Sequence, residues 1–303
     1  MCGLAGELRF DHQPADLAAV ERITHHLAPR GPDAWGFQAQ GPIALGHRRL
    51  KIMDLSDGSA QPMVDAQLGL SLAFNGAIYN FPELREELEA LGYAFYSGGD
   101  TEVLLKGYHA WGEALLPKLN GMFAFAIWER DAKRLFIARD RLGVKPLYLS
   151  RTGQRLRFAS SLPALLKGGD INPILDPVAL NHYLNFHAVV PAPRTLLAGI
   201  EKLPPATWMR IDADGKTEQK TWWTLPYGPR EDEKNLTLQD WTDRVLDSTR
   251  DAVAIRQRAA VDVGVLLSGG VDSSMLVGLL REVGVQDLST FSIGFEDAGG
   301  EAG

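Results

Sequence analysis

The stretch MFAFAIWERDAKRLFIARDRLGVKPLYLSRTGQRLRFAS, residues 122–160, decides the fold class. Its first segment, 122–129, is almost continuously apolar, which indicates a strand covered on both faces. Three more strand patterns follow at hairpin spacing, over 134–139, 146–151 and 156–160. Because helices are predicted in the same region, these strands indicate a sandwich of sheets between helical layers.

The residues before this stretch carry mixed strand and helix patterns. The run Asn80-Phe-Pro-Glu83 is typical of a helix start, because it offers a capping side chain, a proline in the first turn and a glutamate three residues on. That helix is expected to end at Gly92, a natural left-handed position. Strands are predicted over 4–10, 43–49 and 70–74, and helices over 15–27 and from near Thr101.

A second domain is predicted behind the polar segment TLPYGPREDEKN, residues 224–235, which is rich in proline and charge. We divide the chain into domains over residues 1–220 and 221–303. The second has the opening βαβ of a doubly wound α/β domain, and since such a domain normally needs more than one βαβ unit, we expect the sequence to be the N-terminal piece of a longer chain. Its predicted elements are a helix over 238–258, a short buried strand over 261–267, a helix over 273–283 and a strand over 288–295.

Composition narrows the class of protein. The 303 residues are 45% hydrophobic and 23% charged, which is ordinary for a globular protein and excludes a disordered, collagenous or coiled-coil chain. The sequence has no apolar run long enough to cross a membrane and no secretory signal. A single cysteine fits a reducing compartment, so a cytoplasmic location is expected. A net charge of -7 argues against nucleic acid as a partner.

Cys2 is the only cysteine and directly follows the initiator methionine. Removal of Met1 would place a thiol and a free α-amine on one residue, and an amine with an ordinary pKa of about 8 can act as a base beside the nucleophile. Gly3 has no side chain to block approach to the thiol. The alternative is an inert structural cysteine.

Three further residues or pairs suit a site around Cys2. Asn75-Gly76 offers an amide and a backbone N–H, the donors of an oxyanion hole, although the same dipeptide is common in tight turns. Arg49 suits a carboxylate and Asp100 suits an ammonium group. Taken alone, each of these charges also fits a solvated surface, and Asp100 also fits a helix N-cap.

The strongest local signal is Ser268-Gly-Gly-Val-Asp-Ser-Ser274, between a strand pattern and a helix pattern. Backbone N–H groups at a helix N-terminus form a site for phosphate. The segment lacks the lysine of the nucleoside-triphosphate loop and does not have the glycine spacing of dinucleotide sites. Asp272 could hold Mg²⁺ beside pyrophosphate.

Together these motifs resemble the glutamine-dependent asparagine synthetases and their amidotransferase relatives. The similarity extends over almost the whole chain. It covers MCGLAG (1–6), RGPD (30–33), HRRL (47–50), QPM (61–63), FNGAIYNF (74–81), GGDTEV (98–103), LNGMFAFAIWE (119–129), ARDRLGVKPLY (138–148) and LLSGGVDSS (266–274).

The resemblance implies an N-terminal-nucleophile glutaminase of αββα architecture, an α+β domain, followed by a doubly wound α/β ATP-pyrophosphatase domain. Such an enzyme is a carbon–nitrogen ligase that uses glutamine, ATP and Mg²⁺ to amidate a carboxylate such as aspartate, and a homodimer is a possible assembly. Cys2 would attack the glutamine amide, Asn75 and Gly76 would hold the oxyanion, Arg49 the α-carboxylate and Asp100 the α-ammonium. Leu50, Lys51, Ile52, Met53 and Ala77 would line the glutamine pocket. ATP would contact Leu266, Ser268, Gly269, Gly270, Asp272, Ser273 and Ile293, with Asp272 also on the metal.

Two departures from the family pattern leave alternatives open. Ala77 stands where the family commonly has glutamate, and Pro29 where histidine usually precedes R-G-P-D. The region Asn185–Arg194 is similar to members that amidate a small peptide of the N-acetylglutaminylglutamine type. A phosphosugar acceptor is disfavoured by the loop at 268–274. A non-enzymatic relative with a decayed glutaminase fold has Ala77 as its only support.

Overall fold

The computed structural model describes residues 1–228 and 230–294. The chain divides into two compact units, Met1–Leu225 and Pro226–Gly303. No helix in the described residues is both long and apolar enough to cross a bilayer.

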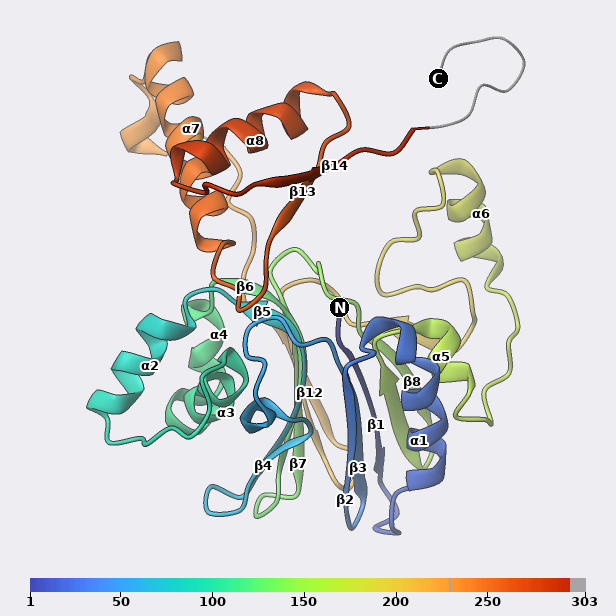
Figure 1. The fold of residues 1–303 in the computed structure, drawn as a ribbon. Coiled ribbons are helices and arrows are strands. Elements are labelled where there is room, and N and C mark those ends of the chain that lie inside the picture. The colour runs from blue at the N-terminus through green and yellow to red at the C-terminus, as the bar shows by residue number, and fades with distance from the viewer. Residues whose placement is uncertain (229, 295–303) are drawn as a thin grey trace. The chain divides into compact units, whose positions relative to one another are not determined.

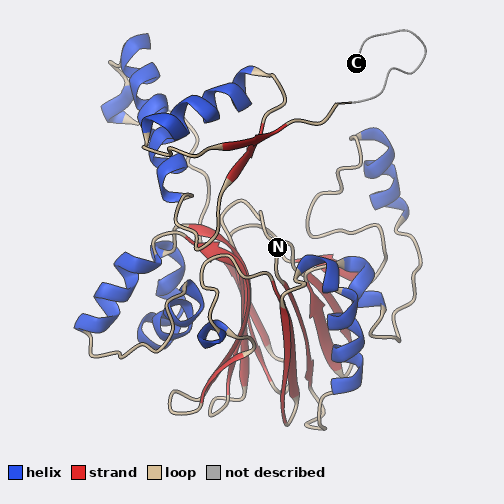
Figure 2. Cartoon of the chain, viewed as in Figure 1, coloured by secondary structure: helices blue, strands red, loops and turns tan. Residues whose placement is uncertain are grey.

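The first unit contains two six-stranded sheets whose neighbouring strands are all antiparallel (Figures 1 and 2). Sheet 1 has the order β10 (Ile200–Lys202), β8 (Tyr148–Thr152), β9 (Arg155–Ala159), β1 (Gly3–Arg9), β3 (Ile43–Arg49) and β2 (Ala34–Gln40). Sheet 2 has the order β12 (Thr217–Thr221), β11 (Thr207–Asp212), β7 (Arg134–Arg139), β6 (Gly121–Glu129), β5 (Leu70–Ile78) and β4 (Met63–Asp65).

Helices cover the outer face of each sheet (Figure 1). On sheet 1 lie α1 (Leu17–His26) and α5 (Leu162–Leu166), and on sheet 2 lie α2 (Phe81–Ala90), α3 (Asp100–Trp111) and α4 (Leu115–Lys118). One apolar core packs beneath each helical layer, and a third, which includes Leu4, Leu45 and Trp128, fills the space between the sheets. The predicted αββα sandwich is therefore confirmed.

The strand predicted to end at Phe74 is longer than expected. β5 continues to Ile78 because it pairs with β6 along its full length, with Asn75 opposite Ala124 and Gly76 opposite Phe123. Asn75-Gly76 thus lies inside a strand and is not a turn.

The helix start at Asn80 is confirmed, but the capping role of its side chain is wrong. α2 begins at Phe81, and the Asn80 side chain makes no capping bond. Its amide instead bonds outside the helix, donating to the Lys118 carbonyl at 2.9 Å and accepting from the Asn120 N–H at 2.8 Å. Gly92 has the predicted left-handed conformation, with φ of 92°.

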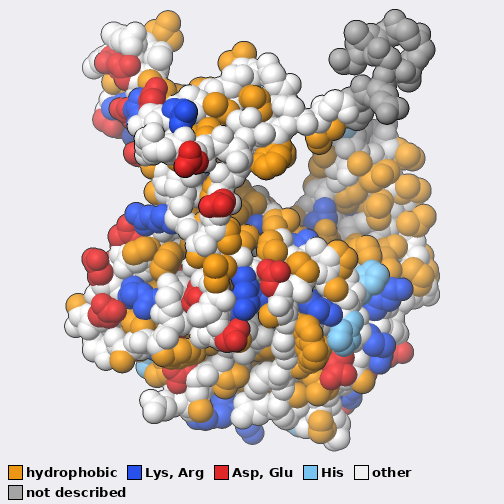
Figure 3. All heavy atoms as spheres, viewed as in Figure 1, with side chains coloured by type: hydrophobic (Ala, Val, Ile, Leu, Met, Phe, Trp, Pro, Cys, Tyr) orange, Lys and Arg blue, Asp and Glu red, His pale blue; other side chains and the backbone are white. Residues whose placement is uncertain are grey.

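A further helix, α6 (Pro177–Asn185), belongs to a long excursion between β9 and β10. Figure 3 shows hydrophobic side chains gathered on the surface over this helix. They include Tyr183, Leu184, Phe186 and Val189, all of which are exposed.

The second unit contains the predicted βαβ. β13 (Gly264–Leu266) and β14 (Ser289–Phe291) are parallel, and α8 (Val271–Glu282) connects them, after α7 (Leu238–Ile255). The first strand is shorter than predicted and is not buried, since Leu266 is 74% exposed. Among the described residues β13 pairs only with β14, so its side chains have little cover. The end of the predicted second strand, residue 295, lies outside the described residues.

Candidate active site

Cys2 lies at the start of β1, beside the end of β3. The antiparallel register of these strands pairs Gly3 with Arg48, so Cys2 comes opposite Arg49 and next to Leu50. The Cys2 Sγ accepts a hydrogen bond from the Leu50 N–H at 3.3 Å, and lies 3.6 Å from the Leu50 carbonyl oxygen. Arg30 Nε donates to the Cys2 carbonyl at 3.0 Å. The thiol is therefore held by backbone contacts on a rigid strand.

The electrostatics of the thiol show which charges surround it. Burial raises the pKa of the Cys2 thiol, the Leu50 N–H lowers it, the Asp100 carboxylate raises it and the Arg49 guanidinium lowers it. The structure thus brings Cys2, Arg49 and Asp100 within reach of one another's charge. Because a thiol with a raised pKa is mostly protonated at neutral pH, a nucleophile here needs a base.

β5 carries the candidate oxyanion donors, and the alternation of its side chains orients them. Phe74 and Ile78 pack into the core beneath α2 and α3, whereas Ala73 packs into the core between the sheets. Since side chains alternate along a strand, Asn75 and Ala77 share the face of Ala73 and point toward sheet 1, the sheet of Cys2.

Gly76 cannot carry a side chain in this position. A Cβ atom there would lie 2.3 Å from the Met122 carbonyl oxygen and 2.5 Å from the Phe74 ring. A glycine is thus required where β5 and β6 approach each other. The neighbouring Asn75 is 1% exposed, and its Oδ1 has no hydrogen-bond partner among the described residues.

Arg49 holds the loop that follows β3. Its Nη1 donates to the Ser56 carbonyl at 2.7 Å and its Nη2 donates to the Asp54 carbonyl at 2.6 Å. The Asp54 carboxylate in turn accepts from the Gly98 N–H at 3.1 Å, which ties this loop to the segment before Asp100. Each Nη keeps a second hydrogen, so a carboxylate can still be bound.

Asp100 is the first residue of α3, and Gly99 is the N-cap. The carboxylate of Asp100 accepts a hydrogen bond from the Ile78 N–H at 2.9 Å, which fixes it against the end of β5. Burial raises the pKa of Asp100 to about 6, although backbone N–H groups and Arg49 act in the opposite direction. The carboxylate is therefore ionised above this pH and can bind a cation.

The remaining predicted pocket residues lie around these groups. Ala77 is 7% exposed on β5, between Gly76 and the Ile78 N–H that binds Asp100. The segment 50–53 continues from β3 into the loop held by Arg49. The ammonium group of Lys51 forms an ion pair with Asp57 at 3.1 Å.

In the second unit, residues 268–270 form a loop that leads into α8, and residues 271–274 form the first turn of that helix. The Ser268 and Ser273 hydroxyls lie 3.1 Å apart, and Ser273 Oγ also donates to the Gly270 carbonyl at 3.1 Å. Gly269 has a φ of 81°, the left-handed conformation that favours glycine. The predicted residues Ser268, Gly269, Gly270 and Ser273 are thus brought together.

The donor set of this loop fits a phosphate group. Backbone N–H groups at the start of α8 and the hydroxyls of the exposed Ser268 and the half-buried Ser273 lie around it. Asp272 is the single acidic residue in the first turn of α8. No cluster of three or more metal-binding side chains occurs in the described residues. A lone carboxylate suits Mg²⁺, which is usually held by one or two carboxylates together with phosphates of the substrate.

The other two predicted ATP contacts lie on or just after the parallel strands. Leu266 pairs with Phe291, and the Ser292 hydroxyl donates to the Leu267 carbonyl at 2.7 Å. Ile293 follows directly and is 78% exposed. The strands therefore place both side chains at the same end of the βαβ.

Comparison with known families decides the identity of the first unit. Residues 1–223 match the family described as the glutamine amidotransferase domain. The chain belongs to the glutamine amidotransferase family. Residues 244–302 of the chain match the asparagine synthase family. The resemblance predicted from the sequence motifs is confirmed.

Curated relatives and solved structures agree with this assignment. The chain is 38% identical over 305 residues to asparagine synthetase [glutamine-hydrolyzing] 1 of Bacillus subtilis, covering 99% of this chain and 46% of that protein. Asparagine synthetase [glutamine-hydrolyzing] 3 of the same organism is 33% identical, with 98% and 48% covered. The chain spans about half the length of these relatives.

A solved structure supports the fold. Glutamine phosphoribosylpyrophosphate amidotransferase from B. subtilis, complexed with ADP and GMP, matches with a TM-score of 0.54 at 17% identity, covering 96% of this chain and 65% of that one. At this identity the likeness concerns the fold alone.

Sequence reasoning missed three residues that contact the site. Arg30 and His47 lie in the motifs RGPD and HRRL and Ser160 ends a predicted strand, but none of the three was predicted as a site residue. Ser160 and His47 contact β5 from the opposite sheet. No local pattern reports such a contact, because the partners are joined only by the packing of the two sheets.

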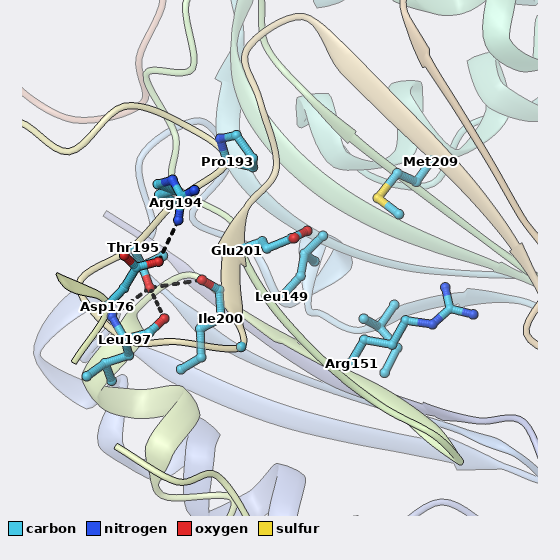
Figure 4. A pocket seen from close by; sticks show the side chains of 12 residues that line it. Leu149, Arg151, Asp176, Pro193, Arg194, Thr195, Leu197, Ile200, Glu201 and Met209 are labelled. Carbon is cyan, nitrogen blue, oxygen red and sulfur yellow. Dashed lines mark hydrogen bonds and ion pairs between the residues drawn. The ribbon is translucent and has the colours of Figure 1, made fainter. Parts of the chain in front are cut away.

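A cavity of about 610 Å³ lies elsewhere in the first unit. Figure 4 shows the ion pair between Arg194 and Asp176 at its wall, with Leu149 and Met209 among its apolar side chains. None of the predicted site residues lines it. The cavity is therefore separate from the site around Cys2.

Proposed function

We propose that the domain over residues 1–220 hydrolyses L-glutamine to glutamate and ammonia at Cys2. The observation that carries this proposal is the placement of the Cys2 thiol beside Leu50, the residue after Arg49, within reach of the charge of Asp100. Arg49 and Asp100 both act on the thiol electrostatically, and they have the charges that bind an α-carboxylate and an α-ammonium group. The side chain of a bound amino acid would then extend toward the sulfur.

Each residue has a defined task in this reaction. The Cys2 sulfur attacks the side-chain amide carbon of glutamine, and its proton passes to the α-amine of Cys2. Asn75 and the Gly76 N–H donate to the oxyanion of the tetrahedral intermediate. The amine returns the proton to the leaving nitrogen, which departs as ammonia. Water then hydrolyses the thioester to glutamate and regenerates the thiol.

The α-amine acts as this base only after Met1 is removed. With Met1 in place, the Cys2 nitrogen is an amide and cannot accept the proton. Intact-mass measurement of active protein tests this point. We expect a chain that begins at Cys2, and full activity of protein that retains Met1 would contradict it.

We propose that the longer protein delivers this ammonia to a carboxylate activated with ATP. Ser268, Gly269, Gly270 and Ser273 would hold the phosphates, Asp272 would hold Mg²⁺, and Leu266 and Ile293 would contact the adenine. Bound ATP would supply the adenylyl group that activates the acceptor. The names of the relatives favour aspartate as that acceptor over a small peptide. Because this proposed reaction uses glutamine and ATP to amidate a small carboxylate, we infer a cytoplasmic location.

A glutaminase assay on this chain tests the main proposal. We expect glutamate release from L-glutamine that is abolished in Cys2→Ala. Absence of turnover by protein that begins at Cys2 would overturn the proposal and would favour a non-enzymatic relative. Pyrophosphate release from ATP by the longer protein, with aspartate and with a small peptide compared as acceptors, tests the second half.

A further inference from the structure

Two buried side chains of sheet 1 reach across the sandwich to the strand that carries the oxyanion donors. Ser160 follows β9, and His47 lies on β3. Their partners, Asn75 and Phe74, are adjacent residues of β5 in sheet 2. Cys2 precedes β1 of sheet 1, so the two contacts join the sheet of the nucleophile to the strand of the oxyanion site.

Ser160 is bonded to both parts of the site. Its N–H donates to the Leu4 carbonyl at 3.0 Å, and its Oγ accepts from the Leu4 N–H at 3.0 Å. Leu4 is only two residues from Cys2. The same Oγ lies 3.5 Å from Nδ2 of Asn75, and Ser160 is 1% exposed. One hydroxyl therefore touches the nucleophile's strand and the oxyanion amide.

The Asn75 amide has an incomplete set of hydrogen bonds that this hydroxyl can complete. Oδ1 is buried and has no partner among the described residues. Buried polar atoms are nearly always paired, so an exception calls for an explanation. Ser160 Oγ accepts from Leu4 and still has its own hydrogen to donate. With the amide turned by half a rotation, Oδ1 accepts that hydrogen and both Nδ2 hydrogens become available to an oxyanion.

His47 restrains the neighbouring peptide group. Its Nε2 lies 2.8 Å from the Phe74 carbonyl oxygen, and the Phe74 N–H donates to Oε1 of Gln61 at 2.6 Å. Burial lowers the pKa of His47 to about 4, so the ring is neutral and carries its hydrogen on Nε2 to meet the carbonyl. The backbone beside Asn75 is thus fixed. The orientation of the Asn75 side-chain amide then depends on its contact with Ser160.

We propose that Ser160 is a positioning residue of the glutaminase reaction, whose hydroxyl orients the Asn75 amide so that Nδ2 donates to the oxyanion formed on Cys2. The proposal rests on the proposed glutamine hydrolysis and adds a residue to it. Ser160 touches neither substrate nor sulfur in this role. Its effect passes entirely through Asn75.

A double-mutant cycle between Ser160 and Asn75 tests the proposal, with kcat and KM for glutamine as the readouts. We expect Ser160→Ala to lower kcat by about 10- to 10²-fold, the effect of a misplaced catalytic group, while KM changes less than about threefold. In the Asn75→Ala background, the same substitution should lower kcat by less than about twofold, because the amide it orients is gone. Ser71→Ala, a buried serine earlier on β5, is the matched control.

Two further measurements separate positioning from a loss of structure. Ser160→Thr keeps a hydroxyl and should recover most of the lost kcat. The rate at which iodoacetamide alkylates Cys2, the only thiol, should be unchanged in Ser160→Ala, because the nucleophile itself is intact.

The outcomes are distinguishable. Wild-type kcat in Ser160→Ala, or an equal loss of kcat with and without Asn75, overturns the positioning role and leaves the glutaminase proposal standing. Slowed alkylation of Cys2 in Ser160→Ala also overturns it, since Ser160 then acts on the nucleophile. If wild-type protein that begins at Cys2 does not hydrolyse glutamine, both proposals fall.

Discussion

The sulfur of Cys2 accepts a hydrogen bond from the backbone N–H of Leu50 at 3.3 Å. The pairing of β1 with β3 leads to this contact, because Gly3 lies opposite Arg48 and Cys2 therefore comes opposite Arg49, the neighbour of Leu50. The residue before Leu50 is Arg49, the candidate anchor for the α-carboxylate. A single strand register therefore places the candidate nucleophile next to the candidate anchor for the α-carboxylate.

Replacement of Cys2 tests the nucleophile. Cys2→Ala should abolish glutamine hydrolysis, by a factor of order 10⁶ as for the loss of other nucleophiles, because the chain has no second thiol. Glutamate release at saturating glutamine measures the effect. Thermal unfolding of the variant serves as the control and should match the wild type within a few degrees. Residual turnover within about tenfold of wild type would identify another nucleophile, since tenfold is only about 1.4 kcal/mol.

Asn75→Ala should lower kcat by about 10²–10³-fold with little change in KM, because an oxyanion donor acts mainly in the transition state. Asn75→Asp is the comparison, because the aspartate side chain is nearly the same size as asparagine but places an acceptor where a donor is needed. Its kcat should be no higher than that of Asn75→Ala. Steady-state kinetics with glutamine measure both. A variant with normal kcat and a raised KM would assign Asn75 to substrate binding instead.

Arg49→Lys should behave like Arg49→Ala, although it keeps the positive charge. The guanidinium holds the Asp54 and Ser56 carbonyls with separate nitrogens, and a lysine ammonium is a single point charge without this fork. We expect KM for glutamine to rise about tenfold or more in both variants, with kcat less affected, because the α-carboxylate has the same charge in ground and transition states. A KM near the wild-type value in Arg49→Lys would show that charge alone is sufficient.

The sequence predicted those parts of the fold that local patterns determine. The predicted bounds of β3 and β7 agree with the structure, and each strand contains an apolar run, Ile43–Leu45 in β3 and Leu135–Ala138 in β7. The edge strand β2 was missed, since its face is partly exposed and its pattern is mixed. Asn80 was assigned a capping role because the local motif is the same, but its amide bonds to the residues around α4 and β6.

The candidate site could be predicted only as separate motifs. Cys2, Arg49, Asn75 and Asp100 each had a plausible alternative role in isolation, and the resemblance to a family was needed to connect them. Ser160 and His47 could not be found, because their contacts with β5 depend on the packing of two sheets.

Gly76→Ala should damage both the fold and the reaction. The added methyl group would lie 2.3 Å from the Met122 carbonyl oxygen, which belongs to the neighbouring strand and cannot move alone. Overpacking of this kind costs about 1–3 kcal/mol. Thermal unfolding should therefore occur at a lower temperature, and kcat should fall because the Gly76 N–H is displaced. Gly92→Ala is a steric control, because no atom lies within 4 Å of its added Cβ and only its φ of 92° is strained.

Glutamine binding should depend on the ionisation of Asp100. Burial raises the pKa of this carboxyl to about 6, so it is charged at pH 7–8 and becomes neutral as the pH falls through 6. A neutral carboxyl no longer attracts the α-ammonium, so kcat/KM should decrease about tenfold for each pH unit below the pKa. The pH profile of kcat should bend at a lower pH than that of kcat/KM. In the complex, the α-ammonium group of bound glutamine stabilises the ionised carboxylate of Asp100 and so lowers its pKa. Asp100→Asn can still accept the Ile78 N–H, and it should bind glutamine weakly without this bend. An unchanged bend near pH 6 in Asp100→Asn would assign the titration to another group.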